Sequence, residues 1–315
     1  MKTGARMGLS RNILLWASEN QYLLEHVPNY RFVRRALKRF MPGEELDDAI
    51  GAAKTFQGDG IPTVFTFLGE SIIDLSEAVK VRDHYIGLLE RIAREKLDIE
   101  VSVKLTQLGL DLSTDHAYEN FKALAIKAKE LNNVVWIDME RSSYVDATLD
   151  LYRKVRKDYS NAGVCLQSYL RRTKKDLESL IEMSPLVRLV KGAYNEPASI
   201  AYPDKEDVDK YYFELSTRLL KGIQDNGVRA AFGTHDTDLH RKIMKVAGDL
   251  SVPKEKVEIQ MLYGIKPNEQ KRLAGEGYNI RVLISYGKAW YKWYVRRLAE
   301  RPANVGFVVR NIFSS

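Results

Sequence analysis

The pattern of apolar and polar positions changes at about residue 63 into a regular alternation of two kinds of segment. Short apolar runs predict strands, and the longer charged segments between them repeat apolar residues at helical spacing. The predicted strands are residues 63–69, 100–105, 134–138, 163–170, 187–194, 229–235, 257–262 and 279–287. Eight such repeats predict a closed parallel (β/α)8 barrel, because each parallel strand needs a crossover helix to return the chain. The competing fold, a doubly wound open sheet, usually carries a Gly-rich turn, and no GxGxxG follows a predicted strand.

The first 60 residues lack this alternation and predict a helical segment that packs on a barrel of residues 61–315. Pro28 and the Pro42-Gly43 pair predict breaks between its helices. Within residues 31–40, apolar side chains recur at helical spacing, and five Arg and Lys residues occupy the other face. A basic amphipathic helix of this kind is typical of a peripheral contact with anionic lipid. The simpler interpretation is a solvated helix that caps the main domain.

Composition narrows the class of protein further. Of the 315 residues, 45% are hydrophobic and 29% are charged, which suits a chain with a large buried core. The net charge of +7 is spread over a long chain and is too dilute to predict nucleic-acid binding. The sequence has no apolar run of about 18 residues, no secretory signal and a single cysteine, Cys165. We therefore expect a cytoplasmic protein without disulfides or a CxxC metal site.

Functional residues of a (β/α)8 barrel lie at the C-terminal rim, where the strands end. The first seven predicted strands bring to that rim Glu70, Lys104, Asp138, Glu140, Gln167, Arg188, Lys191, Thr234, His235, Asp236 and Gln260. Lys104 is the least ordinary of them, because Val103 and Leu105 flank it. A buried ammonium needs a partner such as Asp138, and that pair would serve a structural role as well as a catalytic one.

The helix that follows the last predicted strand carries the densest signal. Arg296 and Arg297 are adjacent, and Trp290, Trp293 and Tyr294 precede them by about one turn. Charge pairing along the helix surface explains part of this pattern but not the aromatic residues. Two guanidiniums beside aromatic faces suit a small carboxylate with an apolar body, since Arg binds a carboxylate through two hydrogen bonds. We therefore expect a carboxylate substrate.

The sequence THDTDLH at residues 234–240 suggests an alternative, a metal-dependent hydrolase on the same barrel. His and carboxylate side chains at barrel rims often bind catalytic metals. If the strand ends near His235, however, Asp238 and His240 lie on the following helix, and no HxH or HExxH sequence supplies further ligands. We predict no metal site. A barrel without catalytic activity, acting as a binding or structural protein, is a third possibility.

Residues 63–311 resemble the FAD-dependent proline dehydrogenases, either the single-function bacterial enzyme or the matching domain of the bifunctional proline-utilisation proteins. The resemblance follows the chain through FLGE, SVKLTQLG, WIDME, CLQSY, VRLVKGAY, GTHD, EIQMLYG and WYVRRLAERPAN. Its most specific parts are VRLVKGAY and RRLAER. The fold that it implies is a distorted (β/α)8 TIM-type barrel with N-terminal helices, in agreement with the strand pattern. In this family the flavin lies across the C-terminal rim.

The resemblance also implies roles for individual positions. Arg296 and Arg297 would hold the substrate carboxylate, and Glu70 would pair with Arg296 to close the site. Lys104 and Asp138 would form a catalytic ion pair beside the substrate and the flavin ring. The contacts of the FAD would be Gln167, Arg188, Val190, Lys191, Gly192, Ala193, Thr234, His235, Gln260 and Glu300.

The activity that the resemblance implies is oxidation of L-proline to 1-pyrroline-5-carboxylate. A hydride would leave the carbon next to nitrogen for flavin N5, beside a catalytic Arg188, and the electrons would pass to a quinone-type acceptor. Such an acceptor would give the basic segment 31–40 a purpose at the inner face of the membrane. Leu283 and Trp293 stand where the family usually has tyrosine, and both, with Leu262, would line the substrate pocket. Hydroxyproline or another proline analogue is therefore the alternative substrate.

Overall fold

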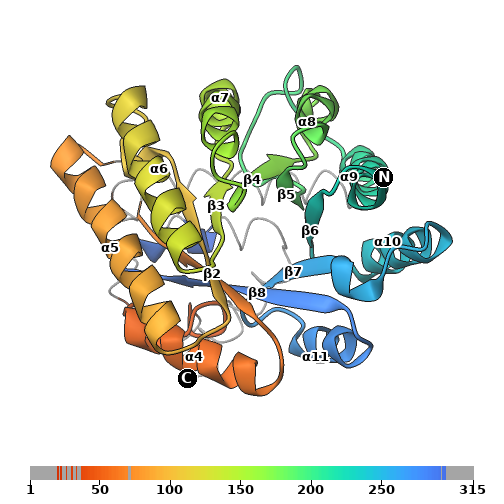
Figure 1. Ribbon diagram of the computed structural model, residues 1–315, viewed down its shortest axis with the longest axis horizontal. Helices are drawn as coiled ribbons and strands as arrows, with labels where there is room; N and C mark the ends of the chain where they lie inside the picture. Colours follow the sequence, from red (N-terminus) through yellow and green to blue (C-terminus); the bar gives the residue numbers. More distant parts are fainter. Residues whose placement is uncertain are drawn as a thin grey trace.

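The computed structural model describes residues 20, 22, 26, 30, 33, 37–69, 72–291 and 293–295. They contain parallel strands that pair in chain order and close into a barrel through β8 and β1 (Figure 1). The strands are β1 Thr63–Phe67, β2 Ile99–Lys104, β3 Val135–Asp138, β4 Ala162–Gln167, β5 Leu186–Val190, β6 Arg229–Gly233, β7 Glu258–Leu262 and β8 Asn279–Tyr286. The predicted (β/α)8 barrel is confirmed.

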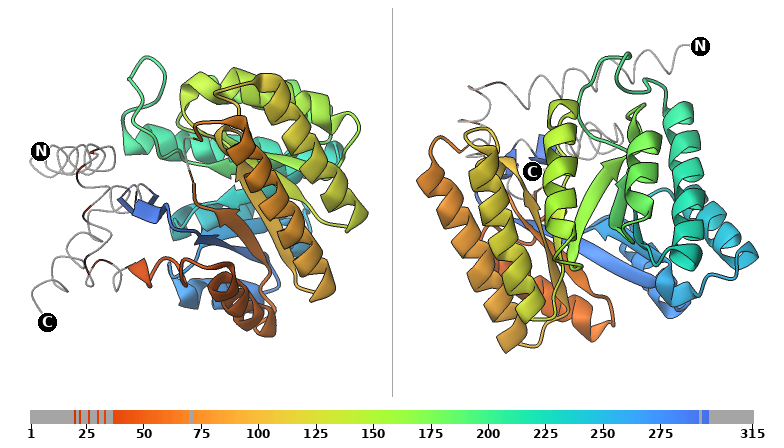
Figure 2. Two further views of the ribbon diagram at one scale, coloured as in Figure 1. Left: turned by 90° about the vertical axis from the view of Figure 1, so that its left-hand side faces the viewer. Right: turned by 45° about the horizontal axis from the view of Figure 1, so that its top comes forward.

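Helices cover the outside of the barrel. Those that follow strands are α5 Leu75–Arg94, α6 Thr114–Glu130, α7 Val145–Arg156, α8 Thr173–Ile181, α9 Lys205–Asp225, α10 Thr237–Asp249 and α11 Pro267–Gly275. Helix α4, Leu46–Gly58, precedes β1 and packs against β1 and β8, so it covers the barrel between α11 and α5 (Figure 1). Figure 2 shows α5, α6 and α7 side by side along the outside of the strands.

Strand residues alternate between the helices and the barrel interior. On β2, Val101 and Val103 belong to the large hydrophobic core between strands and helices, whereas Ser102 bonds to side chains inside the barrel. The middle of the interior holds a separate apolar cluster of Val64, Trp136, Leu186 and Ala231. The polar strand residues that the sequence places between apolar neighbours therefore face inward, above and below this cluster.

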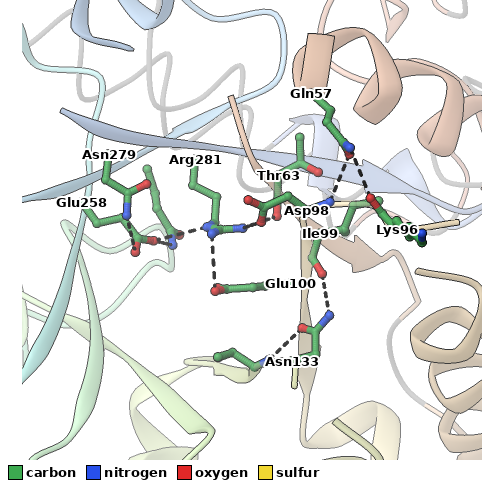
Figure 3. Close-up of polar contacts among 12 residues, drawn as sticks. Gln57, Thr63, Lys96, Asp98, Ile99, Glu100, Asn133, Glu258, Asn279 and Arg281 are labelled. Atoms are coloured by element: carbon green, nitrogen blue, oxygen red, sulfur yellow. Dashed lines mark hydrogen bonds and ion pairs between the residues drawn. The ribbon is translucent and has the colours of Figure 1, made fainter. Parts of the chain in front are cut away.

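Charged side chains fill the N-terminal end of the barrel interior. The carboxylates of Glu100 and Glu258 bind Arg229 at 2.7 and 2.6 Å, and all three come from different strands. Arg281 on β8 lies 3.0 Å from Asp98 and within 3.7 Å of both glutamates, and it also donates to a backbone carbonyl of β1 (Figure 3). Glu100, Glu258 and Arg281 are buried. These five residues, called the lower charge network below, pair every one of their charges.

The described residues between Val33 and Glu44 lie near the other end of the barrel, where β7, β8 and β1 end. Val33, Leu37 and Phe40 are buried in a cluster with Trp290, which lies just after β8. The chain also passes close to the loop after β7, because a Cβ on Gly264 would lie 1.6 Å from the Arg39 carbonyl oxygen. The described apolar positions of segment 31–40 therefore face protein, as the simpler interpretation expects. Its other residues, Arg31, Phe32, Arg34, Arg35 and Ala36, lie outside the described residues.

Helix α4 shares the hydrophobic core of the barrel. Its Ala49, Ile50 and Ala53 belong to the same cluster as the outward faces of the strands. Gln57 at its end donates to the Lys96 carbonyl and accepts from the Asp98 amide, which ties it to the turn before β2 (Figure 3). The boundary at residue 60 stays a prediction, and α4 is one piece of the N-terminal segment that packs on the barrel. None of the described helices is long and apolar enough to cross a bilayer.

Candidate active site

Inward-facing side chains at the C-terminal end of the barrel form a polar layer above the apolar cluster. Arg188 on β5 is 3% exposed, and its Nη1 donates to Asp138 Oδ1 at 2.9 Å and to Ser102 Oγ at 3.0 Å. Ser102 also donates to Asp138 Oδ1 at 2.7 Å, and Thr66 donates to Asp138 Oδ2 at 3.4 Å. Four strands thus fix one carboxylate and one guanidinium in the barrel mouth.

The ion pair predicted between Lys104 and Asp138 is not formed. The two residues are register partners on β2 and β3, but the Asp138 carboxylate binds Arg188 instead. Among the described residues, no carboxylate pairs with the Lys104 ammonium, although Lys104 is 8% exposed. The physical reason is that a guanidinium is more weakly hydrated than an ammonium and is the better partner for a buried carboxylate.

Four side chains of this layer carry buried polar atoms without a hydrogen-bond partner in the described part of the chain. They are Gln167 Oε1 on β4, Nε and Nη2 of Arg188 on β5, Gln260 Oε1 on β7 and Ser285 Oγ on β8. Leaving a buried polar group unpaired costs about 1–3 kcal/mol, so such groups are rare in proteins. They lie on two pairs of neighbouring strands, β4 with β5 and β7 with β8, at one end of the barrel, where a polar ligand would fit, although other unpaired atoms, such as Tyr152 Oη and Arg281 Nε, lie elsewhere.

The side-chain nitrogen atoms of Gln167 and Gln260 both donate hydrogen bonds, and these bonds determine how the two side chains are oriented. Gln167 Nε2 donates to the Met139 carbonyl at 3.3 Å, and Gln260 Nε2 donates to Glu258 Oε1 at 2.6 Å. Each amide is therefore held at its nitrogen and presents its oxygen. Gln260 also links this layer to the lower charge network.

The loop after β5 contains four of the predicted flavin contacts. Val190, Lys191, Gly192 and Ala193 are all half-buried. The Lys191 ammonium binds Asp209 at 2.5 Å and Asp236 at 3.1 Å, so its charge is already paired. Gly192 has φ +115°, and a Cβ there would lie 2.2 Å from the ring of Tyr169. In this structure the close approach that requires this glycine is made by the Tyr169 ring.

The histidines and aspartates of residues 234–240 are used locally. Leu262 N donates to His235 Nε2 at 2.9 Å, and Asp236 caps α10 by accepting from the Asp238 and Leu239 amides. His240 lies on α10, as the sequence predicts, and its Nε2 bonds to the Thr234 carbonyl at 2.9 Å. Thr234 itself is buried. No cluster of three potential ligands that could hold a metal is found in the described ranges.

The surroundings of Asp236 strongly favour the ionised form of its carboxyl group. Burial alone would raise the pKa of Asp236, but the Lys191 ammonium and the amides at the start of α10 lower it to about 2. Lys191 also binds Asp209 on α9. The carboxylate of Asp236 therefore stays charged and ties the loop after β5 to the start of α10.

The predicted substrate wall is split between two places. Leu262 and Leu283 are half-buried at the inner face of β7 and β8, and Leu283 packs against the cluster that contains Trp136. Trp293 is 8% exposed and belongs to the cluster with Val33 and Leu37. Its contact with a substrate stays a prediction.

Four other predicted site residues lie outside the part of the chain that the structure describes: Glu70, Arg296, Arg297 and Glu300. Their predicted roles stay predictions. The described residues that come just before them, Trp290 to Val295, are buried against the N-terminal segment, apart from Lys292, which is not described. Trp290 Nε1 donates to Glu44 Oε1 at 2.9 Å, which fixes the direction in which the chain leaves β8.

Sequence reasoning missed several polar residues of this layer. Thr66 and Ser102 bind the Asp138 carboxylate, and Ser285 carries one of the unpaired atoms. The available signal was the alternation within each strand, which places Ser102 on the same face as Lys104 and Ser285 on the same face as Leu283. Glu100 and Glu258, two strand positions before Ser102 and Gln260, share this signal.

A model of a protein family described as "Proline dehydrogenase" matches residues 49–310 of this chain. The chain belongs to the proline dehydrogenase family. It is 36% identical to proline dehydrogenase 1 of Bacillus subtilis (strain 168), over 96% of this chain and 98% of that protein. It is 37% identical to the proline dehydrogenase of Deinococcus radiodurans, over 87% of this chain and 89% of that protein. Membership of this family makes the chain an oxidoreductase of the proline dehydrogenase type.

The fold is shared with the proline dehydrogenase family as well. The chain is similar to proline utilization A (PutA) from Bdellovibrio bacteriovorus, inactivated by N-propargylglycine, with a TM-score of 0.79 and 25% identity. The match covers 94% of this chain and 36% of that much longer one. The α/β barrel therefore corresponds to about a third of that protein.

Proposed function

We propose that this chain oxidises L-proline to 1-pyrroline-5-carboxylate with a bound FAD and passes the electrons to a quinone-type acceptor. Two observations support the proposal. The chain belongs to the proline dehydrogenase family over most of its length. The C-terminal end of its barrel also carries unpaired polar atoms on Gln167, Arg188, Gln260 and Ser285. The second observation is the one that links the activity to particular residues.

The unpaired atoms fit an isoalloxazine ring in chemical type. Arg188 offers two donors, Gln167 and Gln260 offer one acceptor each, and the Ser285 hydroxyl can do either. The polar edge of the ring carries carbonyl oxygens and ring nitrogens that accept, and one ring N–H that donates. We propose that these side chains hold the ring, with further contacts from Val190, Lys191, Gly192, Ala193, Thr234, His235 and Glu300.

We propose that the substrate lies beside this ring, with its carboxylate held by Arg296 and Arg297 and enclosed by Glu70. Lys104 fits the same role in part, because its ammonium has no carboxylate partner among the described residues. Leu262, Leu283 and Trp293 would pack against the pyrrolidine carbons. When the carboxylate is fixed in this way, the reacting atoms are already aligned, which can lower the activation barrier by about 7 kcal/mol or more.

When bound, the flavin supplies the electron sink that accepts the hydride from the carbon next to nitrogen. The protein supplies charge and position around it. Arg188, buried and bound through Nη1 to Asp138 and Ser102, presents a permanent positive charge to the ligand. A fixed cation in a site with little water stabilises negative charge far better than it would in water. The Asp138 carboxylate keeps that cation in place.

The electron acceptor and a membrane contact are further parts of the proposal. A quinone-type acceptor is expected for the family. Peripheral contact at the inner face of a membrane would involve the exposed Lys38 and Arg39 of segment 31–40. Because Val33, Leu37 and Phe40 are buried in the protein, the contact offered by the described residues of this segment would be electrostatic rather than hydrophobic. Its strength should fall as ionic strength rises.

Anaerobic titration of the purified protein with L-proline tests the proposal. We expect yellow protein whose flavin absorbance is bleached by proline. Arg296→Met or Arg297→Met should weaken proline binding by several kcal/mol, because the substrate carboxylate loses a charge-assisted partner, while the flavin stays bound. If proline does not bleach the flavin absorbance, proline is not the substrate of this protein. Colourless protein that binds zinc would favour the hydrolase instead, although the local use of His235, Asp236 and His240 speaks against it.

One observation favours a proline analogue as a second candidate substrate. Leu283, which has no hydroxyl, packs against the Trp136 cluster where the family's tyrosine is expected. The same titration with hydroxyproline, repeated on a Leu283→Tyr, Trp293→Tyr double variant, separates the two substrates. Unchanged selectivity in the double variant would show that these positions do not decide it.

A further inference from the structure

Trp136 on β3 lies between the two polar ends of the barrel interior. Its side chain is completely buried, and its Nε1 donates to Glu100 Oε2 at 2.7 Å. Glu100 is itself bound by Arg229 Nη1 at 2.7 Å and approached by Arg281 at 3.6 Å. The indole is therefore anchored in the lower charge network by a short hydrogen bond to a carboxylate that cannot easily move.

Two guanidiniums contact the ring of this tryptophan. The Cζ atom of Arg188 lies 4.9 Å from the ring centroid, and the Cζ atom of Arg229 lies 5.4 Å from it. Arg229 belongs to the lower charge network, whereas Arg188 belongs to the polar layer at the C-terminal end. A planar guanidinium stacks on an aromatic face, and the attraction is stronger when water is absent.

The hydrogen bonds of Arg188 leave its orientation incompletely determined. Both of its bonds, to Asp138 and to Ser102, are made by Nη1, and Nε and Nη2 have no partner among the described residues. A guanidinium that is attached to the side chain through Nε and hydrogen-bonded only through Nη1 can still tilt about the line that joins these two atoms. The indole ring supplies the missing constraint, because contact with a flat surface fixes the tilt.

We propose that Trp136 is a positioning residue that holds the Arg188 guanidinium so that Nε and Nη2 are directed at the bound flavin. This inference rests on the proposed function. It adds a residue two positions before Asp138 that itself touches neither substrate nor flavin. It also gives the lower charge network a part in the site, since Glu100 fixes the indole that supports Arg188.

The neighbouring strand is built to accept an indole at this place. A Cβ on Gly163 of β4 would lie 2.4 Å from Trp136 Cε3, so any larger residue there would collide with the ring. Val64, Leu186 and Ala231 pack around the rest of it. The absence of a side chain at Gly163 and the hydrogen bond to Glu100 together fix the indole in one position.

A double-mutant cycle between positions 136 and 188 tests the inference. FAD dissociation constants are measured on apoprotein reconstituted with FAD, for wild type, Trp136→Leu, Arg188→Met and the double variant. We expect Trp136→Leu to weaken FAD binding about tenfold, as loss of a buried cation–π contact predicts. In the Arg188→Met background the same change should have little further effect, because no guanidinium remains to be oriented. Trp136→Phe, which keeps an aromatic face, should restore most of the affinity.

The reduction potential of the bound flavin is the second readout. We expect it to become more negative in Trp136→Leu, because a misdirected cation stabilises the reduced ring less. Phe121→Leu is the matched control, since it removes a completely buried ring from α6 outside the barrel interior. It should lower the thermal midpoint while leaving the potential and the FAD affinity unchanged. If Trp136→Leu does not fold, Trp136→Met is the second variant, because its flexible side chain adapts to an irregular gap and has no aromatic face.

The outcomes separate this inference from the proposed function. If the wild type binds no FAD, or if Arg188→Met binds it as tightly as the wild type, both are overturned. If Arg188→Met weakens FAD binding but Trp136→Leu and Trp136→Met do not, the inference alone is overturned. The same holds if the effects of Trp136→Leu and Arg188→Met are additive, or if Phe121→Leu shifts the potential equally.

Discussion

Arginines lie at both ends of the barrel interior, with Arg188 and Arg281 buried and Arg229 half-buried, but their surroundings differ. At the N-terminal end, Arg229 and Arg281 share Glu100 and Glu258, and each of the four charges has an ion-pair partner, although Arg281 Nε, 3.7 Å from Glu258, makes no hydrogen bond among the described residues. At the C-terminal end, Arg188 has one carboxylate partner, bound through one nitrogen, and its Nε and Nη2 are unpaired among the described residues. Trp136 separates the two arrangements.

The difference separates a structural use of charge from a functional one. A fully paired buried network adds little net stability, yet removing one member leaves the others as uncompensated charges. An incompletely paired layer instead lowers the free energy of unfolding of the ligand-free protein. That free energy rises when a bound ligand supplies the missing partners. In barrel enzymes, active sites lie at the C-terminal face, while the opposite face serves stability. The two ends of this barrel follow that division.

The largest effect should come from breaking the lower charge network. Glu258→Ala leaves Arg229 and Arg281 each with one carboxylate fewer, in a place where Glu258 is 1% exposed. We expect a loss of about 3–5 kcal/mol in the free energy of unfolding, measured by urea denaturation. Asp249→Asn, which removes an exposed ion pair with Lys245, is the control and should cost at most about 1 kcal/mol. Equal stabilities for the two variants would contradict a structural role for this end.

The second largest effect is expected at the C-terminal end of the barrel interior, and it should appear in FAD binding rather than in stability. Arg188→Met leaves Asp138 with the hydroxyls of Ser102 and Thr66, so its cost in stability should be smaller than that of Glu258→Ala. FAD binding should suffer more, because each hydrogen bond from a charged donor contributes about 1.5–3 kcal/mol. We expect at least a tenfold increase in the FAD dissociation constant, measured by reconstitution of apoprotein. A variant that keeps full flavin affinity would show that the two ends do not differ as described.

A smaller effect is expected at a neutral member of the same layer. Gln167→Met keeps the length of the side chain but removes the unpaired Oε1 together with the Nε2 that donates to the Met139 carbonyl, so the free energy of unfolding should fall by about 1 kcal/mol. FAD affinity should fall about fivefold, as for the loss of one neutral hydrogen bond of about 1 kcal/mol. Thermal midpoints and FAD titrations of the same preparation measure both quantities. A large loss of stability with unchanged affinity would assign Gln167 to the fold.

The smallest effect concerns pH. Burial lowers the pKa of His84 below its usual 6.5, so the unfolded chain binds more protons than the folded one just below pH 6.5. Stability should be greatest above that pH and should fall as the pH is lowered from 7.5 to 5.5. His84→Gln should reduce this dependence, measured as thermal midpoints at the two pH values.

Glu100 of the lower charge network should contribute nothing to this dependence between pH 7.5 and 5.5. Burial alone would raise the pKa of Glu100, but Arg281 and Arg229 hold it below 4.5, so its contribution is lost only in more acid solution. A wild type and a His84→Gln variant with identical pH profiles between 7.5 and 5.5 would exclude His84 as the source. A Glu100→Gln variant should keep the wild-type slope there.

The sequence was sufficient for the barrel because apolar runs and helical periods are local properties. Predicted strands began within one residue of the observed ones, for example residues 187–194 against β5 from Leu186. Six of the strand ends were predicted too far along the chain, and the two largest errors, at β4 and β5, have a definite reason. β4 stops at Gln167 because Leu170 N turns back to the Gln167 carbonyl, and β5 stops at Val190 before Gly192 takes a positive φ.

The site was less predictable, because its contacts join residues that are far apart in sequence. Alternation placed Lys104 and Asp138 on inward faces, but not the choice of Arg188 as the partner of Asp138, which depends on how far a β5 side chain reaches across the barrel. The requirement for Gly192 came from the Tyr169 ring in the neighbouring loop. Which polar atoms stay unpaired is a property of the whole packed layer and has no sequence signal.

A crystal structure of the protein loaded with FAD tests the central claim most directly. The account predicts that the isoalloxazine ring lies over the C-terminal ends of the strands, with Arg188 Nε and Nη2, Gln167 Oε1 and Gln260 Oε1 within hydrogen-bond distance of its polar edge. A flavin bound elsewhere, with these four atoms still unpaired, would contradict it.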